Sequence, residues 1–240
     1  MNRDEKIARG GGEPPEVHQI NGTTAIYPTE GAGGTWIAAN EYDITLALLN
    51  WNTTAPCGMD AKTRSRGRVI PALISSRSQS DLQQAFEVSN FEGMMPFRLV
   101  GVFPSEQTIG EWRSDSKQFW FQANPWEARH WFSSSLSDEQ AESLRGAACR
   151  DAQFEPDAGS ATWLRRLHAS HAGGAGPFSL CVHRDDVETL SYSDVAVTAG
   201  QIRMRHLRGS PCMTGQIRSI EIERAACLVS AARDVNSPGF

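Results

Sequence analysis

Apolar residues recur along the chain with two different periods, and Gly and Pro separate the segments. Short strands are predicted where β-branched and aromatic residues gather between these breaks. The predicted strands are 23–27, 35–40, 44–50, 97–103, 117–122, 178–183, 187–192, 195–198 and 201–207. The segment 10–15 is rich in Gly and Pro, and we expect it to be a loop.

The runs 35–40 and 44–50 predict a β-hairpin. The three residues between them, Glu41-Tyr42-Asp43, suit a short hairpin connection. The second run shows little alternation of apolar and polar positions, so we expect both of its faces to be buried in the centre of a sheet. Trp36 is then expected to be buried beside Leu46 or Leu48.

Two helices are predicted before the middle of the chain. The segment 65–76 has apolar residues at helical spacing, and Pro71 fits there if it lies in the first turn. Ser80 is a candidate N-cap for a second helix, which would present Leu82 and Phe86 to the core.

Two further helices are predicted from their capping residues. Ser137 and Gln140 form a capping box for a helix that ends near Cys149. Ser160 is expected to cap the next helix, and one face of that helix would carry the residues Trp163, Leu164, Leu167 and His171.

Strands come first, helices gather in the middle, and strands return at the end, which favours an α+β fold with mainly antiparallel sheets. The chain has 240 residues, and we expect residues 1–240 to form one large domain. Residues 232–240 are small and polar, and we expect this tail to be frayed.

Charge and composition exclude several functional classes. The chain has 23 basic and 28 acidic side chains, and this net charge of -5 argues against a nucleic-acid partner. No apolar run approaches the roughly 20 residues that a membrane-spanning helix needs, and the N-terminal residues lack the apolar core of a signal peptide. The five cysteines include no C-x-x-C pair, which indicates neither a disulfide framework nor a zinc site. The sequence therefore predicts a soluble, cytoplasmic protein.

Side-chain chemistry gives only weak candidates on its own. His168 and His171 could share a metal at i,i+3 spacing, but carboxylates and cysteines at matching helical spacing are missing, so we expect no metal and no cofactor. Cys181 and His183 would point to the same face of a predicted strand. A Cys–His nucleophilic pair is conceivable there, although a buried cysteine in an apolar strand is more typical of inert packing.

The most informative residues are Asn2-Arg3-Asp4-Glu5 at the start of the chain. They are followed in order by four further segments, which are 33–37 (GGTWI), Asn40, 48–50 (LLN) and 65–67 (SRG). This succession resembles the NRDE family, named for the quartet, to which the eukaryotic transport and Golgi organisation protein 2 belongs. The resemblance continues more loosely through 130–135 and 176–184.

The resemblance implies an N-terminal-nucleophile-hydrolase-like fold, an αββα sandwich of two antiparallel sheets between helical layers. In the cysteine branch of those hydrolases, which cleaves bile-salt and penicillin amides, the chain starts Met-Cys and this cysteine is the nucleophile. NRDE members usually also start Met-Cys, one strand ahead of the quartet. This sequence begins at the quartet, and the amide of Asn2 is no nucleophile. Arg3 and Asp4 are also adjacent, whereas the bile-salt enzymes space their arginine and aspartate further apart.

The resemblance also implies a site. It places Arg3 and Asp4, the candidate catalytic residues, at the end of a strand beside a pocket and paired with each other. The remaining expected ligand-binding residues are Asn2, Glu5, Trp36, Asn50, Ser134 and Ser135. Ser133, Ser134 and Ser135 stand near the position where the bile-salt enzymes have an oxyanion-stabilising Asn.

Two functions follow from this resemblance. In the first, the domain is non-catalytic as given and binds a small hydrophobic or haem-like cargo, as proposed for the eukaryotic relatives. In the second, it is a cysteine amidohydrolase acting on a small amide, here truncated at its start. For the sequence as given we favour the first, with a small molecule as the partner.

Overall fold

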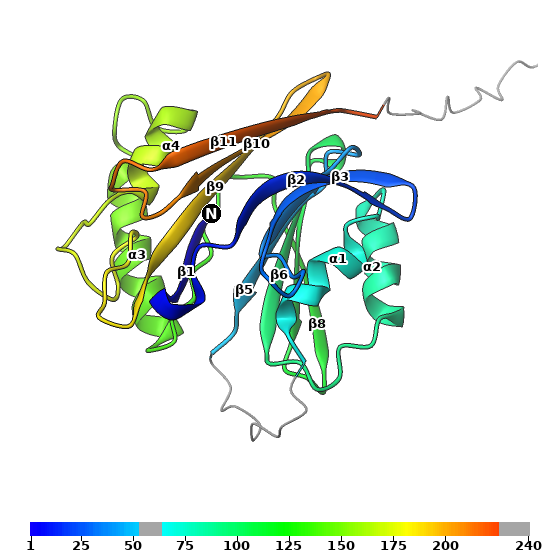
Figure 1. Ribbon diagram of the computed structural model, residues 1–240, viewed down its shortest axis with the longest axis horizontal. Coiled ribbons are helices and arrows are strands. Elements are labelled where there is room, and N and C mark those ends of the chain that lie inside the picture. Colours follow the sequence, from blue (N-terminus) through cyan, green and yellow to red (C-terminus); the bar gives the residue numbers. More distant parts are fainter. Residues whose placement is uncertain (53–63, 226–240) are drawn as a thin grey trace, which may run out of the picture.

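The computed structural model describes residues 1–52 and 64–225. Cys57, Cys227 and the tail 232–240 lie outside the described residues. The described chain forms two antiparallel sheets, packed face to face, with helices on both outer faces (Figure 1). This arrangement confirms the predicted α+β sandwich.

The larger sheet has seven strands, each hydrogen-bonded to its neighbours in sequence. They are β2 (Glu13–Ile20), β3 (Thr23–Thr29), β4 (Ile37–Asn40), β5 (Thr45–Asn50), β6 (Phe97–Phe103), β7 (Thr108–Ser114) and β8 (Phe119–Asn124). The predicted hairpin is confirmed as β4 and β5, in the interior of this sheet. Asp43 ends its turn with a φ of 61°, a left-handed conformation that Asp tolerates better than most residues.

The smaller sheet joins the start of the chain to its end. Its order is β1-β9-β10-β11, and its strands are β1 (Asn2–Lys6), β9 (Val187–Val197), β10 (Gln201–Arg208) and β11 (Gln216–Glu223). β1 pairs with β9 in antiparallel fashion, with an irregularity between Arg3 and Asp4. The quartet therefore belongs to an edge strand of this sheet.

Helices cover the outer face of each sheet (Figure 1). α1 (Val69–Leu73) and α2 (Gln79–Val88) cover the seven-stranded sheet, and α3 (Asp138–Ala152) and α4 (Ala161–His168) cover the four-stranded sheet. Short 3₁₀ helices lie at Ile7–Arg9, Arg66–Arg68 and Pro104–Glu106. In the described residues no helix has both the length and the apolar character to cross a membrane.

The predicted N-caps are confirmed in two helices of three. Ser137 Oγ accepts a hydrogen bond from the Gln140 backbone N–H at 3.1 Å, and Ser160 Oγ caps α4 in the same way. The prediction for α2 was wrong by two residues, because Ser78 rather than Ser80 accepts from the N–H of the third helical residue.

Three apolar clusters correspond to the three contacts between layers. Residues of α1 and α2 pack on the seven-stranded sheet, residues of both sheets pack between them, and α3 and α4 pack around Trp163 and Leu167. Trp36 is buried as predicted, but its side chain belongs to the cluster between the sheets. Trp36 does lie beside Leu48, whose backbone N–H donates to the Trp36 carbonyl at 2.9 Å. The side chains of Leu46 and Leu48 belong to the outer cluster, so they do not share a cluster with the Trp36 ring.

Several predicted boundaries differ from the structure. The expected loop 10–15 already contains the start of β2, where Pro14 and Pro15 are tolerated because β2 is an edge strand. The expected strand 178–183 is irregular and makes only isolated bridges. One continuous strand, β9, replaces the two predicted at 187–192 and 195–198. β7 and β11 were not predicted; β11 has almost no buried face, so its apolar period is weak.

Candidate functional site

Arg3 points into the space between the two sheets. Only 7% of its side chain is exposed. Its guanidinium carbon lies 4.5 Å from the centre of the Trp36 ring. One terminal nitrogen donates to Glu30 Oε1 at 2.8 Å and the other to the carbonyl of Gly10 at 3.0 Å. Arg3 is therefore a buried cation with both terminal nitrogens hydrogen-bonded, and its partner is Glu30 rather than the predicted Asp4.

Asp4 points to the opposite side of β1, toward α3. Its Oδ2 accepts from Arg145 at 3.4 Å, and its Oδ1 accepts from the Thr189 hydroxyl at 2.7 Å. Burial raises the pKa of Asp4, while the charge of Arg145 and both hydrogen bonds act in the opposite direction. Arg145 also donates to the carbonyl of Ser133 at 3.3 Å, which links Asp4 to the predicted serine segment.

The residues around Arg3 form a charged group that we call the arginine patch. It consists of Arg3, Glu5, Arg9, Glu30, Trp36 and Arg66. Glu5 pairs with Arg9 at 2.9 Å, and Glu30 pairs with Arg9 at 3.2 Å through its second oxygen. Burial lowers the pKa of Arg66, and the nearby charge of Glu5 opposes that shift. With three arginines against two glutamates, the patch carries an excess of positive charge.

Three of the segments that resemble the NRDE family, the quartet, 33–37 and 65–67, meet at this patch. The Thr35 backbone N–H donates to the carbonyl of Gly67 at 3.0 Å. A side-chain carbon added to Gly34 would lie only 2.9 Å from the Gly67 Cα, so glycine is required for this close approach. Trp36 from the first of these segments then contacts Arg3 from the quartet. Residues far apart in sequence are thus brought to one place.

Besides Asp4, four predicted site residues lie outside the patch. Asn50 is exposed at the end of β5. Ser134 and Ser135 precede α3, where the Ser134 N–H donates to Asp138 and the Ser135 hydroxyl accepts from Arg184. Asn2 donates to the backbone carbonyls of His168, at the end of α4, and Leu180.

Sequence reasoning missed His206, which is buried on β10 near the patch. Its ring centre lies 6.3 Å from that of Trp36, and its Nδ1 is 2.9 Å from the Ser193 hydroxyl. Burial lowers the pKa of His206 to about 4, and the charges of Arg208 and Arg3 act in the same direction. The imidazole is therefore neutral at pH 7. In the sequence, the only signal for its burial was the period of two that places position 206 on the same strand face as Ile202 and Met204.

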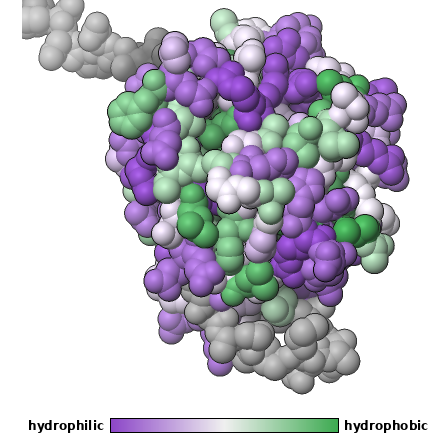
Figure 2. Space-filling view, turned by 90° about the vertical axis from the view of Figure 1, so that its left-hand side faces the viewer, coloured by the Kyte–Doolittle hydropathy of each residue, from purple (hydrophilic) through white to green (hydrophobic). Residues whose placement is uncertain are grey.

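Two surface cavities of the described residues are lined by no residue of the quartet. One of about 440 Å³ lies between α3 and residues 172–179, and a second of about 330 Å³ lies beside it between α3 and α4. None of the predicted site residues lines either cavity. On the face made by α3 and α4, hydrophilic and hydrophobic residues are interspersed (Figure 2).

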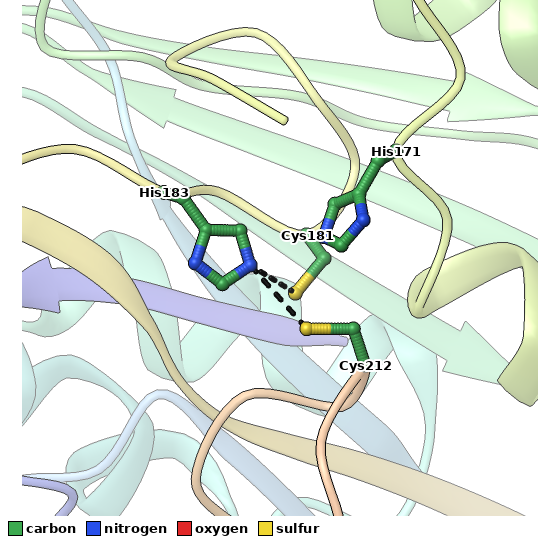
Figure 3. Close-up of side chains that lie close together, drawn as sticks. All are labelled: His171, Cys181, His183 and Cys212. Atoms are coloured by element: carbon green, nitrogen blue, oxygen red, sulfur yellow. Dashed lines mark hydrogen bonds between the residues drawn. The ribbon is translucent and has the colours of Figure 1, made fainter. Parts of the chain in front are cut away.

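A second group of reactive side chains lies beside the start of β9, where His183 bridges to Glu188. It contains His171, Cys181, His183 and Cys212 (Figure 3). The predicted proximity of Cys181 and His183 is confirmed, with Sγ 3.6 Å from Nε2. Burial raises the pKa of the Cys181 thiol to about 12, which makes that thiol by itself a poor nucleophile at neutral pH.

His168 does not belong to this group. Its buried ring lies 5.0 Å from that of Tyr192, whereas the ring of His171 lies 4.9 Å from that of His183. Burial lowers the pKa of His168 well below its ordinary value. The pair of His168 and His171 considered from helical spacing is not formed, since His171 follows the end of α4.

Comparisons with known proteins inform the fold. No family model matches the sequence, and no curated protein matches it significantly. A solved structure of penicillin V acylase from Agrobacterium tumefaciens matches 92% of this chain and 81% of its own, with a TM-score of 0.50 and 12% sequence identity. The chain has an N-terminal-nucleophile-hydrolase-like fold. At this identity the likeness concerns the fold alone, and it confirms the architecture that the quartet and its following motifs implied.

Proposed function

We propose that this chain is an NRDE-family domain that binds a small organic molecule at the arginine patch. The ligand is hydrophobic or haem-like and carries an anionic group. The observation that supports this most is the meeting of the quartet, the segment 33–37 and the segment 65–67 around Arg3 and Arg66. A chain start that was free in solvent would not contact these two later segments.

The charges of the patch favour an anionic group on the ligand. Arg3 and Arg9 share the carboxylates of Glu5 and Glu30. Arg66 donates to the carbonyl of Pro96 at 3.1 Å, which leaves further donors of its planar guanidinium for a ligand. A carboxylate matches such a donor group in both charge and geometry.

Apolar surface next to these charges favours a hydrophobic body on the same ligand. Ile7 lies between the quartet and Arg9, and 45% of its surface is exposed. Trp36 contacts the Arg3 guanidinium and is itself buried in the apolar cluster between the sheets, so Ile7 provides the exposed apolar surface. A molecule that carries a carboxylate on an apolar ring system, such as haem with its two propionates, would satisfy both parts.

Amide hydrolysis is the second candidate, supported by the fold shared with penicillin V acylase. Among the described cysteines, Cys149 lies on α3, and Cys181 and Cys212 lie in the cluster with His183. None of these three thiols belongs to the arginine patch, so for the described residues we favour binding over hydrolysis.

Haemin titration tests the proposal. We expect wild-type protein to bind haemin, with a shift of its visible absorption, and Arg66→Ala to bind at least about tenfold more weakly, because a charge-assisted hydrogen bond contributes about 1.5–3 kcal/mol. Arg203→Ala is the matched control, since Arg203 is an exposed arginine on β10 whose partner is Glu221. Equal affinities in all three proteins would contradict the proposal.

Incubation of the wild type and of Arg3→Ala with penicillin V distinguishes the second candidate. Under the binding proposal we expect no release of the side-chain acid above the rate in buffer. Turnover by the wild type that disappears in Arg3→Ala would favour the amidohydrolase instead.

A further inference from the structure

Four metal-type ligands converge from three separate segments of the chain. His171 follows α4, Cys181 and His183 belong to the irregular stretch before β9, and Cys212 lies in the connection between β10 and β11. The ligand atoms of all four residues lie within 4.8 Å of one another. Figure 3 shows the two sulfurs and a ring nitrogen of His183 facing a common point.

The distances match a tetrahedral zinc site. With Zn–S bonds of about 2.3 Å and Zn–N bonds of about 2.0–2.1 Å, the edges of the tetrahedron are about 3.3–3.8 Å. The Cys181 sulfur lies 3.6 Å from His183 Nε2, and the Cys212 sulfur lies 3.3 Å from the same nitrogen. Two of the six distances between pairs of ligand atoms therefore already have the required length.

The donor set is also the one that zinc prefers. Two cysteine sulfurs with two imidazole nitrogens make a closed four-ligand set, which is typical of structural rather than catalytic zinc. A buried nitrogen of His171, Nε2, has no hydrogen-bond partner among the described residues. Such an orphaned polar atom costs free energy unless something binds it or its ring.

The backbone around the cluster is held in place from several sides. The N–H of Cys181 donates to the carbonyl of Ser170 at 3.1 Å, which keeps Cys181 beside His171. The hydroxyl of Ser210 donates to the carbonyl of Thr189 at 2.9 Å, which anchors the turn before Cys212 to β9. The ligands are thus presented by a framework that exists without the ion.

We propose that His171, Cys181, His183 and Cys212 bind one zinc ion. The ion joins the irregular stretch 170–184 to the connection between β10 and β11, two parts of the chain that share few regular hydrogen bonds. The role is structural, and it is independent of ligand binding at the arginine patch.

Metal analysis of the reduced full chain tests the site. After incubation with zinc and dialysis under anaerobic conditions, we expect about one zinc per wild-type chain. Cobalt(II) in its place should give the intense visible bands and the sulfur-to-metal charge transfer of a tetrahedral thiolate site. Cys212→Ala should lose both signals. Cys149→Ala should keep both, because Cys149 is a free, buried cysteine on α3 outside the cluster.

Thermal denaturation gives a second measurement. A chelator should lower the melting temperature of wild-type protein, and zinc should restore it, because a bound metal stabilises the folded state. Cys212→Ala should melt at one temperature with or without the chelator. Cys212 is only half-buried, so its variant is expected to fold; His183→Asn provides a second variant.

Three results would overturn the proposal. The first is reduced wild-type protein that binds neither zinc nor cobalt. The second is equal metal content in Cys212→Ala and Cys149→Ala. The third is a Cys181–Cys212 disulfide, found by mass spectrometry in protein isolated without oxygen, whose reduction produces no affinity for zinc.

Discussion

At the scale of single residues, Asn40 shows that a motif residue can have a structural role. Its side chain is fully buried, and its amide nitrogen donates to the carbonyls of Ile74 and Ser76 at 2.7 and 2.8 Å. Its amide oxygen accepts from the backbone N–H groups of Tyr42 and Ile44. Asn40 thus ties the β4–β5 turn to the end of α1 and is no part of the arginine patch.

We expect Asn40→Ala to lower the free energy of unfolding by about 2–4 kcal/mol, because four buried backbone groups lose their partner. Denaturant unfolding measures this change. Gln19→Ala is the control, since the Gln19 amide makes one exposed hydrogen bond, to Thr24, and it should change stability by no more than about 0.5 kcal/mol. A loss of similar size in both variants would contradict the role assigned to Asn40.

At the scale of elements, local signals located the helices better than the outer strands. The side-chain caps Ser137 and Ser160 act within one turn of their helices, so the sequence nearby is sufficient to predict them. The stretch 178–183 is apolar enough to predict a strand. It forms only isolated bridges, between Gly176 and Val182 and between His183 and Glu188.

The contact between the segments of Gly34 and Gly67 provides a prediction at this scale. Gly34→Ala should destabilise the protein by about 1–3 kcal/mol, because the added carbon would lie 2.9 Å from the Gly67 Cα. Gly31→Ala is the matched control, because its added carbon would meet nothing within 4 Å. We also expect Gly34→Ala, but not Gly31→Ala, to weaken haemin binding, which titration would detect. Equal melting temperatures for the two variants would contradict the requirement for close approach.

At the scale of the whole molecule, one polar link joins the end of the small sheet to the large sheet. Arg224, just after β11, donates to Asp43 in the β4–β5 turn and to the Ser105 hydroxyl at 2.6 Å. Ser105 also donates to Asp43 at 2.7 Å. The Asp43 side chain is only 2% exposed, so this link is shielded from water in a way that surface ion pairs are not.

A double-mutant cycle of Asp43→Asn and Arg224→Gln should therefore give a coupling free energy of about 1–3 kcal/mol in unfolding experiments. Asn keeps the tolerance for positive φ that position 43 requires. The exposed pair of Asp157 and Arg166 is the control cycle, and it should give no more than about 0.5 kcal/mol. A coupling as small at Asp43 as in the control would show that the link does not hold the sheets together.

The site was predictable only in part. The quartet and its following motifs indicated that Arg3 and Trp36 belong together, and the structure has Arg3 over the Trp36 ring. The partner of Arg3 was not predictable, because Glu30 reaches it from the end of β3 rather than from a neighbouring position in the chain. The cysteine and histidine cluster carried no recognisable spacing, since its four ligands come from three segments that meet only in the folded chain.

The sequence by itself determined the class of the fold and the position of its centre. Strands such as β5 and β6 are apolar at most of their positions, a pattern typical of strands in the interior of a sheet. The tertiary structure decided which side chains share a site. Arg3 and Asp4 are adjacent in sequence, yet consecutive residues of a strand point to opposite faces. Arg3 therefore meets Glu30 between the sheets, while Asp4 meets Arg145 beneath α3.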